Sequence, residues 1–241
     1  MKNLNLFFLT LILNLIMLTA SNTNAQKITG DGNVVKETRS IGSFSEITTE
    51  GVVNVYLSQG STESVVVEAD KNLIAYIITK SDGDKLVIKT RDELEVEKST
   101  KMNVYVTLKN ITKLENNNVG KLETVNQLNL NTLNIDNNSV GSTKLDLKCS
   151  DLKVDFNSVG NLTLTGEITK VSIDHNGVGN VNAEELSADI VKIDNNGVGN
   201  AEVNCNKELY MNLNGIGNIS YKGNGVVKEL NISGMGKVKK M

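Results

Sequence analysis

A glycine recurs through the second half of this 241-residue chain at intervals of 18 to 21 residues, and its neighbours recur with it. The surrounding stretch reads HNGVGN at 175–180, NNGVGN at 195–200 and LNGIGN at 213–218. Seven copies align on one glycine: Gly120, Gly141, Gly160, Gly179, Gly199, Gly217 and Gly236. A period of this length is typical of a solenoid, in which each copy forms one coil and stacks on the next.

Apolar residues accompany the glycine in three columns, which lie directly before it, six residues before it and two residues after it. The column directly before the glycine contains Val119, Val140, Val159, Val178, Val198, Ile216 and Met235. Within each copy apolar residues alternate with polar ones, as in Leu152–Phe156, and this period of two predicts strands. We expect each coil to bury roughly five aliphatic side chains.

Asparagine occupies the position three residues before the glycine in six of the seven copies: Asn117, Asn138, Asn157, Asn176, Asn196 and Asn214. Glycine supplies the positive φ that a bend needs, and stacked asparagine side chains can hydrogen-bond along the stack. A phosphate-binding loop is disfavoured, because that motif places a single glycine loop between a strand and a helix. The absence of proline from the chain also fits stacked strands, in which most N–H groups are paired.

The first 25 residues have the features of a secretory signal peptide. Lys2 precedes the apolar run Leu6–Leu18, and Thr23-Asn24-Ala25 fits a small-residue cleavage site. The apolar run is shorter than the roughly 20 residues that span a bilayer. We therefore expect residues 1–25 to be removed and the remainder to lie outside the cytoplasm without a membrane span.

Residues 26–110 are also strand-like but lack the repeat. Val53, Val55 and Leu57 alternate with polar residues, Asp82-Gly83 predicts a turn between two strands, and Lys71–Ile78 is a candidate short helix. We expect a β-rich portion over 26–110 that is continuous with solenoid repeats over 111–241. The predicted fold is all-β: a parallel β-helix or β-solenoid with about seven regular coils of 18–21 residues and an irregular N-terminal β-rich portion.

Three segments resemble a known family: the GVGN and GIGN copies, IGSFSEITTEGVVNVYLSQG at 41–60, and ADKNLIAYIITKSDGDKLVIKT at 69–90. They are similar to the family described as putative auto-transporter adhesin, head GIN domain, over about residues 44–235. The resemblance implies an exported, right-handed β-helix-like protein of Gram-negative bacteria, and the family name implies adhesion. It brings no catalytic residues with it.

A polar, often acidic column stands five residues before the glycine, and its four aspartates are Asp136, Asp155, Asp174 and Asp194. Stacked carboxylates could bind Ca²⁺ or sugar hydroxyls. They could also supply an acid/base pair, in which case Asp155, Asp174 and Asp194 would serve a glycan-active β-helix enzyme. The interpretation that we favour is a solvated outer face without a catalytic, cofactor or metal site, because Lys153 and Lys192 share that face.

The single histidine and the two cysteines give no further site. His175 is expected to be a variable face residue, because no metal-binding or catalytic partner repeats with it. Cys149 and Cys205 lie three coils apart, and three strand spacings of about 4.8 Å exceed the Cα separation of a disulfide. We therefore predict two free thiols.

The functional prediction is an exported, non-enzymatic binding or structural module of the cell envelope. A net charge of −3 gives no electrostatic basis for nucleic-acid binding. The expected partner is a glycan or an envelope or host protein, and the expected location is the periplasm or the surface of a Gram-negative bacterium. The glycan-active enzyme remains the alternative, and a purely stiffening module is a third interpretation.

Overall fold

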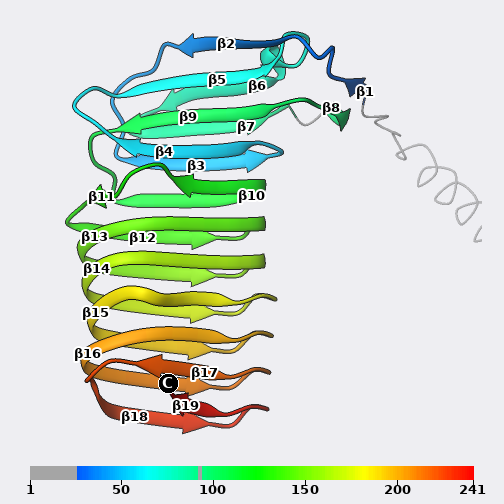
Figure 1. The fold of residues 1–241 in the computed structure, drawn as a ribbon. Coiled ribbons are helices and arrows are strands. Elements are labelled where there is room, and N and C mark those ends of the chain that lie inside the picture. Colours follow the sequence, from blue (N-terminus) through cyan, green and yellow to red (C-terminus); the bar gives the residue numbers. More distant parts are fainter. Residues whose placement is uncertain (1–25, 92–93) are drawn as a thin grey trace, which may run out of the picture.

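The computed structural model describes residues 26–91 and 94–241, so the predicted signal peptide lies outside the described residues. The described chain is almost entirely strands, which stack in a column of coils (Figure 1). Nearly all of them belong to one continuous sheet, and only β1 and β8 form a separate pair. Within the described ranges, no helix is long and apolar enough to cross a bilayer.

The repeats form a parallel β-solenoid of about seven coils, which confirms the predicted fold class. The strands are β10 (Lys113–Thr124), β11 (Leu128–Asn129), β12 (Thr132–Asn137), β13 (Val140–Phe156), β14 (Val159–His175), β15 (Val181–Asn195), β16 (Ala201–Leu213), β17 (Ile219–Lys222), β18 (Val226–Ile232) and β19 (Val238–Lys240). Each pairs in parallel with the equivalent strand of the next coil. Equivalent residues are partners, so Gly120 pairs with Gly141 and Gly141 with Gly160.

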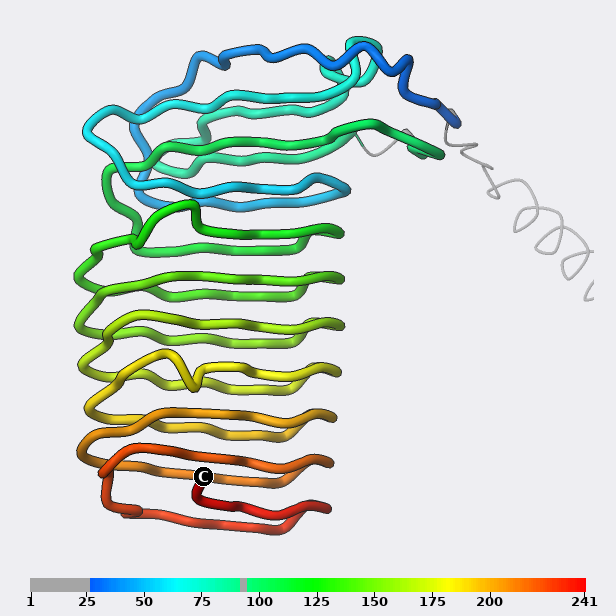
Figure 2. Tube along the Cα trace, viewed as in Figure 1, coloured from blue at the N-terminus to red at the C-terminus, as the bar shows by residue number. Residues whose placement is uncertain are grey.

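Each coil is flattened, with two strand layers that join at two edges (Figure 2). One edge, on the right in that view, contains the Asn/Gly segment between the end of β12 and the start of β13. We call it the Asn/Gly edge. The recurring glycine has φ between +141° and +148° in the copies from Gly120 to Gly217, as the predicted bend requires.

The core lies between the two layers and is aliphatic. The column six residues before the glycine is buried from Leu114 to Met211, and so is the column two residues after it, from Leu122 to Ile219. The third apolar column, directly before the glycine, is exposed in every coil. It faces outward because the in–out alternation of the strands continues through the Asn/Gly edge.

The N-terminal portion continues the stack and then changes its pairing. Its elements are β1 (Gln26–Thr29), β2 (Val34–Arg39), β3 (Glu46–Gly51), β4 (Asn54–Gln59), β5 (Ser64–Asp70), the 3₁₀ turn η1 (Ile74–Tyr76), β6 (Ile77–Asp82), β7 (Lys85–Thr90), β8 (Leu94–Lys98) and β9 (Met102–Leu108). Parallel pairs β3–β10, β4–β10, β3–β7 and β4–β9 extend both layers. Antiparallel pairs β2–β5, β5–β9 and β6–β7 lie above them.

Two local predictions can be compared with this portion. The turn at Asp82-Gly83 is confirmed, since β6 and β7 pair antiparallel around it and Gly83 has φ +64°. The short helix over Lys71–Ile78 is wrong in type and extent. The segment forms only a 3₁₀ turn, in which the N–H of Tyr76 donates to the carbonyl of Leu73 at 2.9 Å, because Ile77 is already extended and pairs in β6.

Candidate functional site

The four aspartates proposed from the sequence do form one file. It lies on the outer face of the strand layer that leads into the Asn/Gly edge. Asp136 pairs with Asp155, Asp155 with Asp174, and Asp174 with Asp194, each in the next coil. All four side chains are partly exposed. The spacing of the repeat therefore brings together residues that are up to 58 positions apart in the sequence.

Lysines neutralise three of these carboxylates. The Nζ atom of Lys153 lies 2.9 Å from Oδ2 of Asp155, and that of Lys192 lies 2.8 Å from Oδ2 of Asp194. Both pairs follow from their spacing of two residues, which places them on the same face of a strand as predicted. Asp136 is paired with Lys113 of the preceding coil at 3.2 Å.

Two adjacent carboxylates of the file differ in acidity. Burial raises the pKa of Asp174 above its usual value, and the neighbouring Asp194 raises it further. Burial would also raise the pKa of Asp194, but hydrogen bonds from Lys192 and Asn212 lower it below the usual value. Such a split is what an acid/base pair needs, although it also arises wherever two like charges are stacked.

Calcium binding, which the sequence left open as an alternative to a site-free face, has no direct support in this file. Among residues 26–91 and 94–241, no three or more histidine, cysteine or acidic side chains are grouped so that they could hold a metal ion. Ca²⁺ takes six to eight oxygen ligands, and three of the aspartates already bind ammonium groups. Calcium binding therefore stays the untested alternative to a solvated face.

Asparagine side chains form two hydrogen-bonded ladders at the Asn/Gly edge. In the predicted column, Asn138 Nδ2 donates to Asn117 Oδ1 at 3.0 Å, and Asn196 Nδ2 donates to Asn176 Oδ1 at 3.1 Å. Asn157–Asn138 and Asn214–Asn196 are joined in the same way. A second ladder follows the glycine: the side chains of Asn180 and Asn218 donate to Asn161 and Asn200, and the backbone N–H of Asn200 donates to Oδ1 of Asn180. These contacts confirm side-chain hydrogen bonding along the stack.

The exposed column directly before the glycine lies between the two ladders. Its residues are consecutive partners from coil to coil, as in Val159–Val178 and Val178–Val198. Sequence reasoning treated this column only as an apolar feature of the repeat and missed its exposure. The strand alternation carried the signal, because this position lies five positions after one buried column and three before the other, and both offsets are odd.

The prediction for His175 is wrong: it is fully buried rather than a face residue. Its column lies four residues before the glycine and points inward, so His175 packs against Phe156 with ring centroids 5.3 Å apart. In the coils above, the same inward column holds the hydrogen-bonded pair Asn116 and Asn137. Neither ring nitrogen of His175 has a hydrogen-bond partner among the described residues, and burial lowers its pKa.

Both cysteines are free, as predicted, and both are buried. Burial raises the pKa of the Cys149 thiol to about 11, and burial also raises that of Cys205. Thiols in this state are poor nucleophiles and poor metal ligands. The cysteines therefore contribute to packing.

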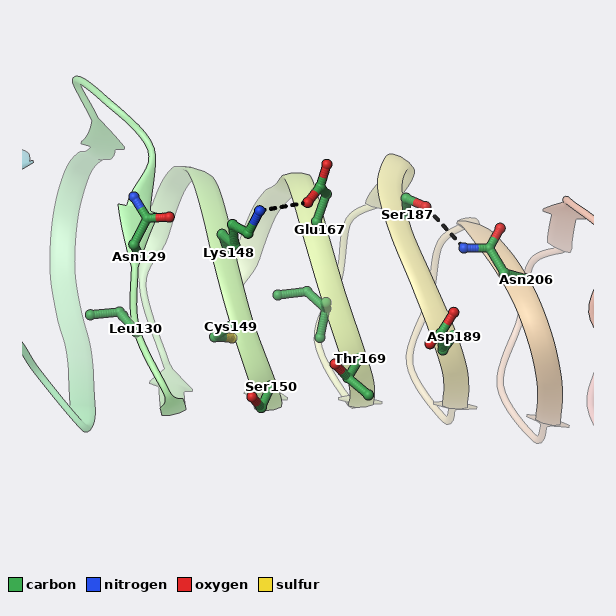
Figure 3. A pocket seen from close by; sticks show the side chains of 11 residues that line it. Asn129, Leu130, Lys148, Cys149, Ser150, Glu167, Thr169, Ser187, Asp189 and Asn206 are labelled. Carbon is green, nitrogen blue, oxygen red and sulfur yellow. Dashed lines mark hydrogen bonds and ion pairs between the residues drawn. The ribbon is translucent and has the colours of Figure 1, made fainter.

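A groove of about 570 Å³ crosses five successive coils at the edge opposite the Asn/Gly edge (Figure 3). Its residues are Asn129, Leu130, Lys148, Cys149, Ser150, Glu167, Ile168, Thr169, Ser187, Asp189 and Asn206. The Nζ atom of Lys148 lies 3.0 Å from Oε2 of Glu167, and Nδ2 of Asn206 donates to Oγ of Ser187 at 3.0 Å. We call this surface the five-coil groove, and sequence analysis did not find it.

Stacked coils with files of repeated outward side chains define a β-solenoid with an extended, regular outer surface. The family model described as putative auto-transporter adhesin, head GIN domain, matches residues 43–225, which is more than half of the sequence. The protein belongs to this family, as the sequence motifs indicated.

Solved structures of related proteins share this fold. A putative adhesin from Bacteroides fragilis has 25% sequence identity and a TM-score of 0.85, and the alignment covers 89% of this chain and 100% of that one. A putative lipid binding protein from Parabacteroides distasonis has 19% identity and a TM-score of 0.69, covering 90% and 100%. A putative adhesin from the same species has 24% identity and a TM-score of 0.63, covering 90% and 100%. No curated protein matches the sequence.

Proposed function

We propose that this protein is an exported, non-enzymatic adhesin-like module of the Gram-negative cell envelope that binds a glycan chain in the five-coil groove. Membership of an adhesin head family supports the adhesive role. The observation that carries the glycan assignment is the groove itself, which has the volume of a small-molecule site and a polar rim over a partly apolar floor.

The groove offers the chemistry that sugar hydroxyls require. Glu167 and Asp189 supply acceptors, Lys148 supplies donors, and Ser187 and Asn206 supply both. Leu130, Cys149 and Ile168 are buried below this rim, and they provide an apolar surface for the C–H groups of a sugar ring. An array of this composition suits a neutral saccharide better than a charged polymer, because both signs of charge are present.

The rim side chains also contact one another across adjacent coils. The Lys148–Glu167 ion pair and the Asn206–Ser187 hydrogen bond each link two adjacent coils, and Lys207 holds Asp189 at 2.9 Å. Because equivalent groups lie on successive coils, the groove suits an elongated chain that runs along the stack.

The test is a glycan array with the purified protein, followed by calorimetry on each hit. Glu167→Gln should weaken binding by roughly tenfold, the value of one charged hydrogen bond. Glu123→Gln makes the same chemical change outside the groove, on the same strand layer but closer to the Asn/Gly edge, and should leave the affinity unchanged. Capture of an envelope or host protein, with no glycan bound, would refute the glycan assignment and retain a binding role.

The proposed location has its own test. Protease added to intact cells should degrade the protein if it is displayed at the surface, whereas a periplasmic protein would survive until the outer membrane is opened. Survival under the first condition would argue against adhesion to other cells.

One observation favours the enzymatic alternative, namely the opposite pKa shifts of Asp174 and Asp194. A glycan-active enzyme would release reducing ends from a polysaccharide, and Asp174→Asn would abolish that release by removing the acid. We expect no turnover with either form across a broad polysaccharide panel.

A further inference from the structure

An unbroken file of exposed apolar side chains runs along the Asn/Gly edge from β3 to the last coil. It consists of Val52, Val119, Val140, Val159, Val178, Val198, Ile216 and Met235, and we call it the valine ridge. Val52 joins it because its neighbour Gly51 pairs with Asn118. These side chains are between 47% and 67% exposed.

Single exposed valines are normal on soluble proteins, whereas a contiguous apolar strip of several hundred Å² is often functional. The side chain at this position does not pack in the core, since the columns on both sides of it already fill the interior. A polar residue at the same outward position would keep the glycine bend and the backbone pairing. The recurrence of an apolar residue in every coil therefore points to a surface that is covered by a partner.

The flanks of the ridge are uncharged over its central part. From Asn138 to Asn218 the two neighbouring files are almost entirely asparagine, with Ser142 as the exception. Within the ladder, the side chain of Asn138 donates one N–H to Asn117 and accepts a hydrogen bond from Asn157. Its second N–H and second lone pair remain for a partner that approaches the ridge.

This surface does not suit a membrane or a charged polymer. Protein segments that bind anionic lipid or nucleic acid carry clustered lysine or arginine. The central ridge has none beside it, and lysines flank it only near the ends of the stack, at Lys121 and Lys237. The ridge is also aliphatic and lies on a narrow convex edge, whereas small ligands bind in concave sites.

A second copy of this chain has the matching geometry. Successive ridge residues are one strand spacing apart, about 4.8 Å, and only another stack of strands presents side chains at that interval. Two such rows can interdigitate as the identical side chains of paired sheets do. A two-fold axis in the contact plane also places the asparagine files of one copy against those of the other.

The area is sufficient for a dimer. Each half-exposed valine offers on the order of 50 Å² of apolar surface, so the ridge supplies about 400 Å² per copy. The flanking asparagine files bring the contact to roughly 800 Å² per partner, which is the size of a stable interface. We propose that two copies of this chain associate side by side through the valine ridge.

Such a dimer leaves both five-coil grooves free, because the groove lies on the opposite edge. Two outward grooves would allow bivalent binding, a consequence that rests on the proposed function. The dimer itself can be measured without any glycan, so the failure of either proposal is distinguishable from the failure of the other.

The test is sedimentation equilibrium of the purified protein from about 1 μM to about 1 mM. We expect a dimer that dissociates within this range, and Val178→Lys should weaken it at least about 100-fold, because it buries an unpaired charge. Val125→Lys is the matched control, since Val125 is 67% exposed but lies outside the ridge. Circular dichroism and thermal melts confirm that each variant is folded.

A second variant makes the result independent of charge. Val178→Thr keeps the shape and removes apolar surface, so it should weaken the dimer by a smaller factor than the lysine does. A monomer throughout the range, or equal weakening by Val125→Lys, would overturn the proposal. A monomer that binds neutral phosphatidylcholine vesicles in a Val178-dependent manner would overturn it too and assign the ridge to lipid.

Discussion

Adding a single methyl group to Gly179 tests whether the coils are as close as the stacked arrangement requires. Gly179 has φ +148°, and a Cβ atom there would overlap the carbonyl oxygen of Gly160 in the coil above. That oxygen belongs to the backbone and cannot rotate away. Gly179→Ala must therefore strain its own backbone and also separate two coils.

The magnitude follows from two contributions. A backbone conformation that only glycine adopts readily costs about 1–3 kcal/mol for alanine. Separation of these two coils weakens the two local backbone hydrogen bonds between them, Gly160 N to Val178 O at 2.9 Å and Val178 N to Ser158 O at 2.8 Å. At about 0.5–1.5 kcal/mol each, these bring the expected loss to roughly 2–6 kcal/mol. This is a large part of the stability of an ordinary domain.

The assay is urea denaturation followed by circular dichroism. Gly32→Ala is the control, because Gly32 has φ +77° but a methyl group added there would meet no atom within 4 Å. The control should lose only about 1–2 kcal/mol, the cost of the backbone conformation without a clash. If Gly179→Ala is no more destabilising than Gly32→Ala, the close contact between coils does not exist and the reasoning is refuted.

Three further predictions concern buried groups. Because burial lowers the pKa of His175, the unfolding free energy should fall as the pH drops below about 6.5. His175→Leu should remove that pH dependence and add about 1–2 kcal/mol of stability at pH 7, and an unchanged pH dependence would contradict this. A hydrogen bond from Tyr105, 2.8 Å from Glu68, lowers the pKa of Glu68. The stability that the ionised Glu68 carboxylate contributes is complete above its unfolded-state pKa of about 4.3 and is lost as the pH falls below that value. Glu68→Gln should therefore make the unfolding free energy less dependent on pH over that range. Cys149 and Cys205 should resist a thiol reagent at pH 8 until urea unfolds the protein, and rapid labelling of the native state would show that they are accessible.

Periodicity alone predicted the features that depend on the backbone. The interval between glycines gives the length of one coil, and parallel stacking then places like residues in files. From this it follows that Asp155 and Asp174 are neighbours, that Asn176 and Asn196 share a hydrogen bond, and that the two cysteines cannot bridge. None of these conclusions needs the shape of the coil.

The direction of individual side chains was harder to predict, because residue character and position disagree at two columns. Val178 is apolar but faces out, and His175 is polar but faces in. Strict alternation from the buried residues Ile173 and Val181 gives the observed direction of both. Hydrophobicity was the weaker guide at this edge, where a surface that we assign to a partner replaces the usual polar exterior.

The five-coil groove could not be derived from the repeat. It lies where the coils differ in length, and the pairing of β15 with β16 shifts between Ala183 and Ser187. Extra residues at such a bend change which side chains meet, so the groove depends on coordinates that no column alignment supplies. The N-terminal antiparallel strands were unpredictable for the same reason, since they lack the repeat.

Cysteine cross-linking tests the stacked register most directly. In the double variant Asn176→Cys, Asn196→Cys, the thiols should replace a side-chain contact of 3.1 Å between adjacent coils and oxidise to a disulfide. In the pair Asn176→Cys, Asn195→Cys, the second thiol is displaced by one residue and points into the core, so no bridge should form. A bridge in the second pair rather than the first would contradict the account.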